Sequence, residues 1–336
     1  MKKSTKLLVS ASAIAGAAML YWKEDKYYKK YPILKEYRSL THFAFPPCMV
    51  APKPTKIYNK LSTREVVEME NVVTTTRRIR SYDGEEIFVN LIEPLDVKEG
   101  ESLPCIVYYH GGGYVTGALK SYFTVMEKYV NLVRCKVVFV HYRTLFEKNA
   151  DACFEDSYAA LQWTYDNARM LGIRRDKIAV AGDSAGGGIT AAITHMIRDR
   201  KGPEVCYQML IYPVVDSSMS TKSMKLFTDV PAWNAKTNAK MWDAMKKSLS
   251  PDMLEYVSPI MMSDFSGLCN GYVEVEEYDC LHDEGKLYAQ RLIENGYQIE
   301  LNDIKGTFHG FDQRFNKVLS KQIFEKRARV LRKAFE

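Results

Sequence analysis

The sequence lacks the cysteine pattern of a disulfide-stapled or zinc-binding protein. Its 336 residues include seven cysteines, an odd number, which are scattered and form no C-x-x-C pair. Disulfide frameworks use even numbers of cysteines at regular spacings, so this distribution argues against one. We therefore expect free, buried thiols and a reducing environment for the body of the chain.

Motifs of nucleic-acid and dinucleotide binding are also missing. The sequence contains no Walker loop, zinc-finger spacing or RNA-binding aromatic motif, and no G-x-G-x-x-G opens a helix. The net charge of +6 indicates no such partner either, because residues 1–30 carry +5 of it. The other 306 residues carry only +1, so we expect no nucleic-acid partner. The 46% of hydrophobic residues suffices for a large core.

The N-terminal segment has a composition of its own. Lysines flank an uncharged stretch of sixteen residues from Leu7 to Trp22. As a helix this stretch would span roughly 24 Å, slightly less than the ~30 Å hydrocarbon core of a bilayer. We interpret residues 1–26 as a membrane anchor, with membrane association through residues 7–22 and the body of the chain in the cytoplasm. The alternative is a signal segment that is cleaved near residues 15–17, which would give a secreted protein.

The body beyond residue 70 alternates short apolar runs with helical patterns. Residues 72–94 hold two β-rich runs around Asp83-Gly84, which predicts a hairpin. Further apolar, β-branched or aromatic runs predict strands at 105–110, 136–142, 177–182, 207–213, 271–279 and 299–304. This alternation predicts an α/β fold with a mostly parallel central sheet and helices on both faces. The long interruption at 214–258 has no strand signal.

A serine lies in a glycine-rich turn after the third of these runs. The segment Gly182-Asp183-Ser184-Ala185-Gly186 fits G-x-S-x-G between an apolar strand and a helical pattern. A serine at such a tight turn is held out from the sheet with its hydroxyl exposed. The N–H of Ala185 then lies at a helix N-terminus, where it can stabilise an oxyanion. The alternative is a turn that only packs the helix against the strand.

A nucleophilic serine needs a base and an acid that orients the base. Of the six histidines, His309 is the expected base, because it lies in a Gly-bounded loop after the last strand. His282, at the start of a helix, is more peripheral. Asp279, at the end of the strand 271–279, is the expected acid, and Asp283 is its competitor. The order Ser184, Asp279, His309 is that of α/β-hydrolases.

A second glycine-rich turn follows the strand at 105–110. In His110-Gly111-Gly112-Gly113, three successive glycines let backbone N–H groups approach a reacting carbonyl closely. Alone, this segment could equally be a phosphate-binding turn. Together with "GDSAGGG", "YVSPIM", "DCLHDEG" and "HGF", however, it gives residues 75–325 a set of motifs in one order. In these motifs the sequence resembles the hormone-sensitive-lipase-like family of α/β-hydrolases, which includes acetyl esterases and arylacetamide deacetylases.

The resemblance implies an α/β-hydrolase fold whose oxyanion donors are the N–H groups of Gly112, Gly113 and Ala185. It implies no metal or organic cofactor. We also expect supporting roles for three neighbouring residues, His110, Asp183 and Asp283.

The resemblance further implies a helical cap over the site. The cap would consist of residues 27–70 and the insertion 214–258, within a catalytic domain of residues 71–336. Three large side chains of the insertion indicate an apolar lining, namely Phe227, Trp233 and Trp242. The segment after the strand 136–142 lacks the prolines usual in the family, so we expect a rearranged loop there.

The expected function is that of a serine carboxylesterase that hydrolyses small to medium acyl esters through an acyl-enzyme. One alternative is an amide or N-acetyl hydrolase with the same machinery, as in the family's deacetylases. Another is a ligand-binding protein on an inactive hydrolase fold. The presence of His309 counts against the last, because receptors with this fold have lost the catalytic histidine.

Overall fold

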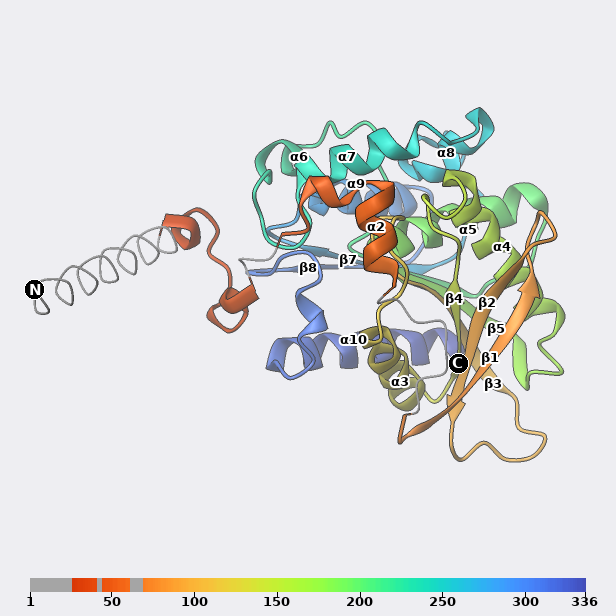
Figure 1. Ribbon diagram of the computed structural model, residues 1–336. Helices are drawn as coiled ribbons and strands as arrows, with labels where there is room; N and C mark the ends of the chain where they lie inside the picture. The colour runs from red at the N-terminus through yellow and green to blue at the C-terminus, as the bar shows by residue number, and fades with distance from the viewer. Residues whose placement is uncertain (1–25, 41–43, 61–68) are drawn as a thin grey trace, which may run out of the picture.

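The computed structural model describes residues 26–40, 44–60 and 69–336. Its centre is an eight-stranded sheet of order β1-β2-β4-β3-β5-β6-β7-β8 (Figure 1). The strands are β1 (Val72–Arg80), β2 (Glu86–Pro94), β3 (Leu103–Tyr109), β4 (Lys136–His141), β5 (Ile173–Asp183), β6 (Tyr207–Ile211), β7 (Gly271–Glu276) and β8 (Ile299–Ile304). The β1–β2 and β2–β4 pairs are antiparallel, and the remaining pairs are parallel. The expected hairpin and the mostly parallel sheet are therefore confirmed.

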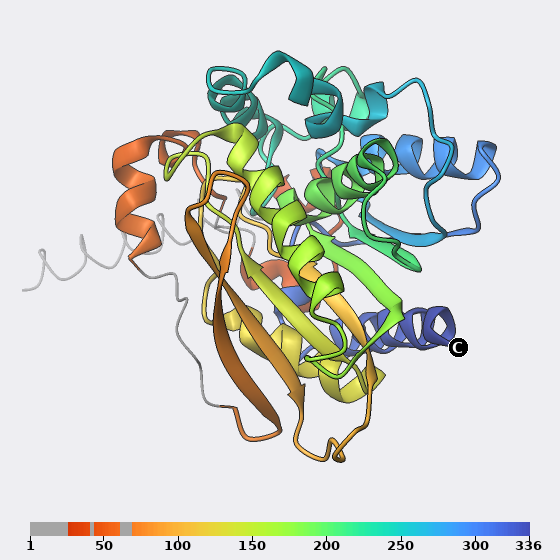
Figure 2. The ribbon, with the colours of Figure 1, turned by 90° about the vertical axis from the view of Figure 1, so that its right-hand side faces the viewer.

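Helices cover both faces of the sheet (Figures 1 and 2). The helices of the sheet layers are α3 (Ser121–Val133), α4 (Ala150–Asp166), α5 (Ala185–Arg200), α9 (His282–Glu294) and α10 (Val318–Phe335). Helices α3 and α10 contribute to one hydrophobic cluster with the sheet, whereas α4 and α5 contribute to a second one. Helix α9 packs beside α5 in a third cluster. The α/β-hydrolase fold expected from the sequence is confirmed.

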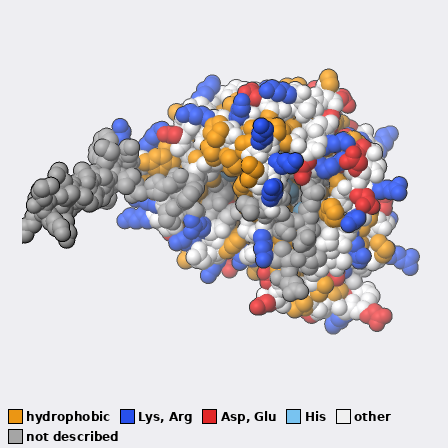
Figure 3. Space-filling model, viewed as in Figure 1, with side chains coloured by type: hydrophobic (Ala, Val, Ile, Leu, Met, Phe, Trp, Pro, Cys, Tyr) orange, Lys and Arg blue, Asp and Glu red, His pale blue; other side chains and the backbone are white. Residues whose placement is uncertain are grey.

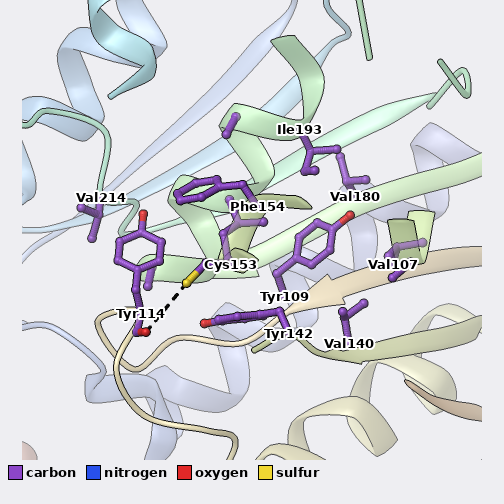
Figure 4. Close-up of a cluster of buried hydrophobic side chains, with 14 of the residues drawn as sticks. Val107, Tyr109, Tyr114, Val140, Tyr142, Cys153, Phe154, Val180, Ile193 and Val214 are labelled. Carbon is purple, nitrogen blue, oxygen red and sulfur yellow. Dashed lines mark hydrogen bonds between the residues drawn. The ribbon is translucent and has the colours of Figure 1, made fainter. Parts of the chain in front are cut away.

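The alternation of side chains along β4 shows why the strands are apolar on both sides. Val138 and Val140 pack toward α4 and α5, and Val137 and Phe139 pack toward α3 and α10. Successive strand residues point to opposite faces, so a sheet covered twice needs apolar residues at nearly every position. Figure 4 shows Val140 in the first of these clusters, beside Tyr142 and below Tyr109.

Two strand ends differ from the expectation by three residues or more. Strand β5 begins at Ile173, four residues before the predicted start, because Ile173 pairs with Leu103 across an irregularity in the β3–β5 ladder. Strand β7 ends at Glu276, so Asp279 lies in the loop after the strand and not at its last position. The interpretation of Asp279 as a strand-end residue was therefore wrong by three residues.

The segments between β6 and β7 form short helices above the carboxyl ends of the parallel strands (Figure 1). They are α6 (Lys222–Leu226), α7 (Ala235–Met245), η3 (Pro251–Met253), α8 (Leu254–Val257) and η4 (Pro259–Met261). The N-terminal segments η1 (Lys35–Leu40), η2 (Pro47–Met49) and α2 (Pro52–Asn59) precede the sheet, and η5 (Phe311–Gln313) follows β8.

Residues 44–45 are attached to this insertion. Ala44 forms a β-bridge with Ala232, and the N–H of Phe45 donates to the carbonyl of Ala232 at 2.7 Å. The hydroxyl of Thr237 donates to the carbonyl of Phe45 at 2.6 Å. The N-terminal segment and the insertion therefore lie side by side above the sheet. The domain boundaries at residues 26 and 70 stay a prediction.

The expected membrane segment, residues 7–22, lies outside the described residues. Within the described ranges, no helix combines the length and the apolar character needed to cross a bilayer. All seven cysteines are free; Cys105, Cys135, Cys153 and Cys280 are buried and Cys48 is exposed.

Candidate active site

Ser184 occupies the sharp turn between β5 and α5. Its φ of 56° and ψ of −119° lie outside the regions that non-glycine residues ordinarily adopt. A Cβ at Gly186 would collide with the carbonyl of Tyr109, and one at Gly182 would collide with the carbonyl of Gly186. The two flanking glycines are therefore required for the turn to pack against β3. The turn presents the Ser184 hydroxyl at the carboxyl edge of the sheet.

The three residues expected to act together are in contact. The Nε2 atom of His309 lies 2.8 Å from the Oγ atom of Ser184. The Nδ1 atom of His309 lies 2.6 Å from the Oδ2 atom of Asp279. Asp279 is fully buried, and His309 is 8% exposed. These residues follow β5, β7 and β8, whose carboxyl ends share one edge of the sheet.

The structure separates Asp279 from its competitor. The second carboxylate oxygen of Asp279 accepts a hydrogen bond from the N–H of Leu281 at 2.9 Å, which fixes the carboxylate toward His309. Asp283 instead accepts the N–H of Ser223 at 2.8 Å, and its other oxygen lies 2.8 Å from Nδ1 of His282. Asp283 therefore connects α9 to α6, whereas His282 also faces Asp303 of β8, and neither contacts His309.

The Gly111–Gly113 turn is fixed by Asp183, the residue before the serine. One oxygen of Asp183 accepts the hydroxyl of Tyr108 at 3.0 Å and the N–H of Gly111 at 3.1 Å. The other accepts the hydroxyl of Tyr122 at 2.7 Å. Burial raises the pKa of Asp183 to about 6, although these donors act in the opposite direction. The side chain joins the two glycine-rich turns.

Gly112 and Gly113 have backbone conformations that favour glycine. Their φ angles are 120° and 60°, and a Cβ at Gly113 would lie 2.5 Å from Cη2 of Trp233. Both line the same cavity as Ser184 and His309. Ala185, the third expected donor, is the first residue of α5. Helix N-termini present N–H groups that lack intrahelical acceptors.

His110 lies beneath this turn and does not contact Ser184. Its ring stacks on Tyr142 with centroids 4.3 Å apart, and its Nδ1 atom lies 2.7 Å from the carbonyl oxygen of Gly111. The hydroxyl of Tyr142 donates to the carbonyl of His110 at 2.8 Å. The side chain therefore packs inside the fold, where it can support the turn.

A cavity of about 700 Å³ opens over Ser184 and His309. Most of its wall is aromatic or apolar, with contributions from Phe45, Met49, Tyr58, Leu119, Tyr122, Tyr212, Trp233 and Phe308. The expectation of an apolar lining is confirmed for Trp233. It is wrong for Trp242, which is buried in the core, and for Phe227, which packs against Tyr31 and Tyr278.

A buried polar chain behind His309 was missed in the sequence. The ring of Tyr212 packs on that of His309 with centroids 4.7 Å apart, and its hydroxyl donates to Asp312 at 2.9 Å. Arg327, on α10, donates to the other oxygen of Asp312 at 2.7 Å and to Glu274. One signal was available: Arg327 occupies the apolar face of its helix, and a charge there needs a partner.

No metal site competes with this arrangement in the part of the chain that the structure describes. Among those residues, no three or more His, Cys, Asp or Glu side chains are grouped so that they could hold an ion. The chemistry available at the site is that of a hydroxyl, an imidazole and a carboxylate beside backbone N–H groups. Such a set suits attack on a carbonyl carbon.

Comparison with known proteins gives consistent similarities. A family model described as an alpha/beta hydrolase fold matches residues 106–313. A protein of Acanthamoeba polyphaga mimivirus named as an alpha/beta hydrolase is 30% identical over 287 residues, 83% of this chain and 80% of that protein. The carboxylesterase NlhH of Mycobacterium tuberculosis is 34% identical over 238 residues, 70% and 74% of the two chains. The solved structure of a bacterial heroin esterase is similar with a TM-score of 0.82 and 28% identity, over 91% of this chain and 99% of that one.

Proposed function

Since this chain belongs to the hormone-sensitive-lipase-like family of α/β-hydrolases, we propose that it is a serine carboxylesterase. The observation that carries the proposal is the continuous contact from Ser184 through His309 to Asp279. The similarity to proteins named as esterases supports it. A cavity of about 700 Å³ with aromatic walls suits esters with small to medium acyl groups.

In the first half of the reaction, the Oγ atom of Ser184 attacks the ester carbonyl carbon while Nε2 of His309 takes the hydroxyl proton. Asp279 accepts the Nδ1–H of His309, so that Nε2 is free to act as the base, and its charge stabilises the imidazolium that forms. The N–H groups of Gly112, Gly113 and Ala185 stabilise the negative oxygen of the tetrahedral intermediate. His309 then protonates the departing alcohol, which leaves an acyl group on Ser184.

In the second half, a water molecule attacks the acyl carbonyl and gives a proton to His309. The tetrahedral intermediate collapses, the carboxylic acid leaves, and Ser184 recovers its proton from His309. The same N–H groups stabilise both tetrahedral intermediates. Each such donor contributes roughly 3 kcal/mol to transition-state stabilisation in a serine hydrolase.

The test is hydrolysis of p-nitrophenyl esters from acetate to octanoate by the wild type and by Ser184→Ala. We expect the variant to lose about six orders of magnitude in kcat, as when the nucleophile of a serine hydrolase is removed. Ser266→Ala, an exposed serine on a loop, is the matched control and should retain full activity. Equal rates for wild type and Ser184→Ala would refute the proposal. Matched acetate and acetanilide substrates separate esterase from amidase activity.

We also propose that residues 7–22 hold the protein at a membrane, with the body of the chain in the cytoplasm. The proposal is supported by the length and uncharged character of that stretch and by its flanking lysines. Extraction of membranes with alkaline carbonate should leave the full chain in the pellet. Mass spectrometry should find an intact N-terminus, and a mature chain that begins near residues 15–17 would support the secreted alternative instead.

A further inference from the structure

The cavity over Ser184 has one cationic side chain in its wall. Among the described residues that line it, Arg314 is the one Lys or Arg, and Asp183 is the one Asp or Glu. Arg314 follows η5, five residues after His309 along the chain, and its backbone N–H donates to the carbonyl of Phe311 at 3.2 Å. The loop that carries the proposed base therefore also carries this charge.

Arg314 differs from three other arginines in having no side-chain partner among the described residues. The buried Arg143, the partly buried Arg198 and the exposed Arg200 each form ion pairs with nearby carboxylates, at 2.6–2.9 Å. Arg314 is also partly buried, yet its guanidinium has no ion pair, hydrogen bond or ring contact within the part of the chain that is described. A guanidinium presents five N–H donors in a planar fork that matches a carboxylate.

The acidic side chain of the cavity, Asp183, neither pairs with Arg314 nor repels an anion strongly. Both oxygens of Asp183 are already occupied by the hydroxyls of Tyr108 and Tyr122 and by the N–H of Gly111. Asp183 is also 4% exposed, so its charge is largely withdrawn from the cavity. The accessible charge in the wall is consequently positive.

The surroundings of the cavity have the same sign. Helix α2, whose Tyr58 lines the cavity, carries Lys53 and Lys56, is followed by Lys60 and contains no acidic residue. All three lysines are exposed, and Figure 3 shows Lys and Arg side chains gathered over this helix. A positive rim raises the local concentration of anionic molecules and speeds their encounter with the site.

From these observations we propose that Arg314 is a specificity residue for esters that carry a carboxylate remote from the scissile bond. The carboxylate pairs with the guanidinium while the ester carbonyl lies at Ser184. Aromatic walls hold the uncharged part of the substrate, and the lysines of α2 steer it to the opening. This inference rests on the esterase function proposed above and adds to it the charge class of the substrate.

The experiment compares charged and neutral esters of matched size. The acyl pair is the p-nitrophenyl monoester of glutaric acid against p-nitrophenyl pentanoate. The alcohol pair is 4-carboxyphenyl butyrate against 4-acetylphenyl butyrate. The two pairs show whether Arg314 binds a carboxylate on the acyl part or on the alcohol part of the ester. Each is measured as kcat/KM for the wild type, Arg314→Gln and Arg314→Lys.

We expect Arg314→Gln to lower kcat/KM for the anionic member of at least one pair by about tenfold or more, mainly through KM. A charge-assisted hydrogen bond has roughly that value. The neutral members should change less than twofold, which also shows that the variant is folded. Arg314→Lys should recover part of the loss, and the loss should shrink in high salt. Lys317→Gln, which removes a nearby charge outside the cavity wall, is the matched control and should have little effect.

Two results would overturn the inference. One is an equal loss on charged and neutral esters, which would make Arg314 a residue that shapes the cavity. The other is no loss on any ester. If the wild type hydrolyses neutral esters and Arg314→Gln loses no activity specifically on the anionic ester of either pair, only the role of Arg314 is refuted and the esterase function stands. A wild type that hydrolyses neither class refutes the esterase function, and this inference with it.

Discussion

Individual residues in this site adopt conformations that only the surrounding contacts can maintain. Ser184 and Tyr212, both of which lie against His309, have φ angles of 56° and 37°. Non-glycine residues at positive φ cost about 1–3 kcal/mol each and persist where packing determines them. Hydrogen bonds hold Ser184 from both sides: its N–H donates to Ile211 at 2.8 Å, and its carbonyl accepts from Gly188 at 3.0 Å. The proposed nucleophile is thus positioned before any substrate arrives.

Gly113→Ala tests the close approach of the turn to the roof of the cavity. The new Cβ would lie 2.5 Å from Trp233, and residue 113 has a φ of 60°. The turn must therefore shift, and its N–H no longer points at the oxyanion. We expect kcat to fall by roughly 100-fold or more, as when an oxyanion donor is removed. Gly84→Ala has a similar positive φ and no atom within 4 Å of the new Cβ. It should lower stability by about 1 kcal/mol and leave kcat unchanged. Equal kcat for the two variants would contradict this.

Asp279→Asn and Asp283→Asn form a matched pair that separates the two candidate acids. Asn at 279 cannot hold the Nδ1–H tautomer of His309, and kcat should fall by about 10⁴ with little change in stability. Asp283 contacts Ser223 and His282 instead, so Asn there should change kcat less than about threefold. The measurement is steady-state hydrolysis of p-nitrophenyl butyrate. The reverse order of losses would mean that Asp283 orients His309.

At the level of elements, α10 is attached to the site by a single buried cation. Arg327 is 1% exposed and bridges Glu274 on β7 to Asp312 in η5, which in turn holds Tyr212 against His309. A helix on the far face of the sheet thereby fixes a ring that contacts the proposed base. The connection therefore runs through β7 and η5.

Arg327→Met removes that cation and leaves two buried carboxylates without a partner of opposite charge. We expect the free energy of unfolding in urea to drop by about 3–5 kcal/mol. Arg329→Met, an exposed arginine on the same helix, should change it by less than about 0.5 kcal/mol. Similar unfolding midpoints for Arg327→Met and Arg329→Met would show that the buried network contributes little stability.

The elements themselves were largely predictable, and their ends were not. Strands covered on both faces are apolar at nearly every position, so their centres are evident in the sequence. The early start of β5 depends on pairing of Ile173 with Leu103 across an irregular ladder, which no local pattern indicates. The early end of β7 has a similar cause, because Tyr278 already donates to Thr307 in the next loop.

The site was predictable to the same extent. Ser184, Asp279 and His309 could be found because motif, chain order and sheet edge agree. The contact of Tyr212 with Asp312 spans 100 residues, and the lack of a partner for Arg314 within the described ranges depends on how the chain folds. Neither leaves a trace in local sequence, and both depend on how the loops after the strands pack.

For the whole molecule, one buried histidine makes stability depend on pH. His195 on α5 is fully buried, with its Nε2 atom 3.0 Å from the hydroxyl of Tyr288. Burial lowers its pKa from 6.5 to about 3. In the unfolded chain the ring gains a proton near pH 6.5, whereas in the folded protein it stays neutral down to about pH 3. The free energy of unfolding therefore falls as pH drops through this window, by up to about 1.4 kcal/mol per pH unit.

His195→Gln should remove this part of the pH dependence. Between pH 8 and pH 5, the loss of unfolding free energy should be about 2 kcal/mol smaller in the variant than in the wild type. Asp183, whose raised pKa of about 6 acts with the opposite sign, is present in both proteins and cancels in the comparison. Urea titrations at pH 8 and pH 5 measure the free energy of unfolding of each protein, and His282→Gln, at a partly exposed histidine, is the control. Parallel pH dependence in wild type and His195→Gln would contradict the expectation.

The contact between Thr237 and Phe45 joins residues 192 positions apart, which has a consequence for the order of assembly during synthesis. Phe45 leaves the ribosome long before its partners exist, and Ser184 is also made before Ala232 and Thr237. The wall of the cavity above the serine can close only after residue 237 has emerged. On a nascent chain, the segment around Phe45 therefore lacks its contacts with Ala232 and Thr237 until these residues have been made.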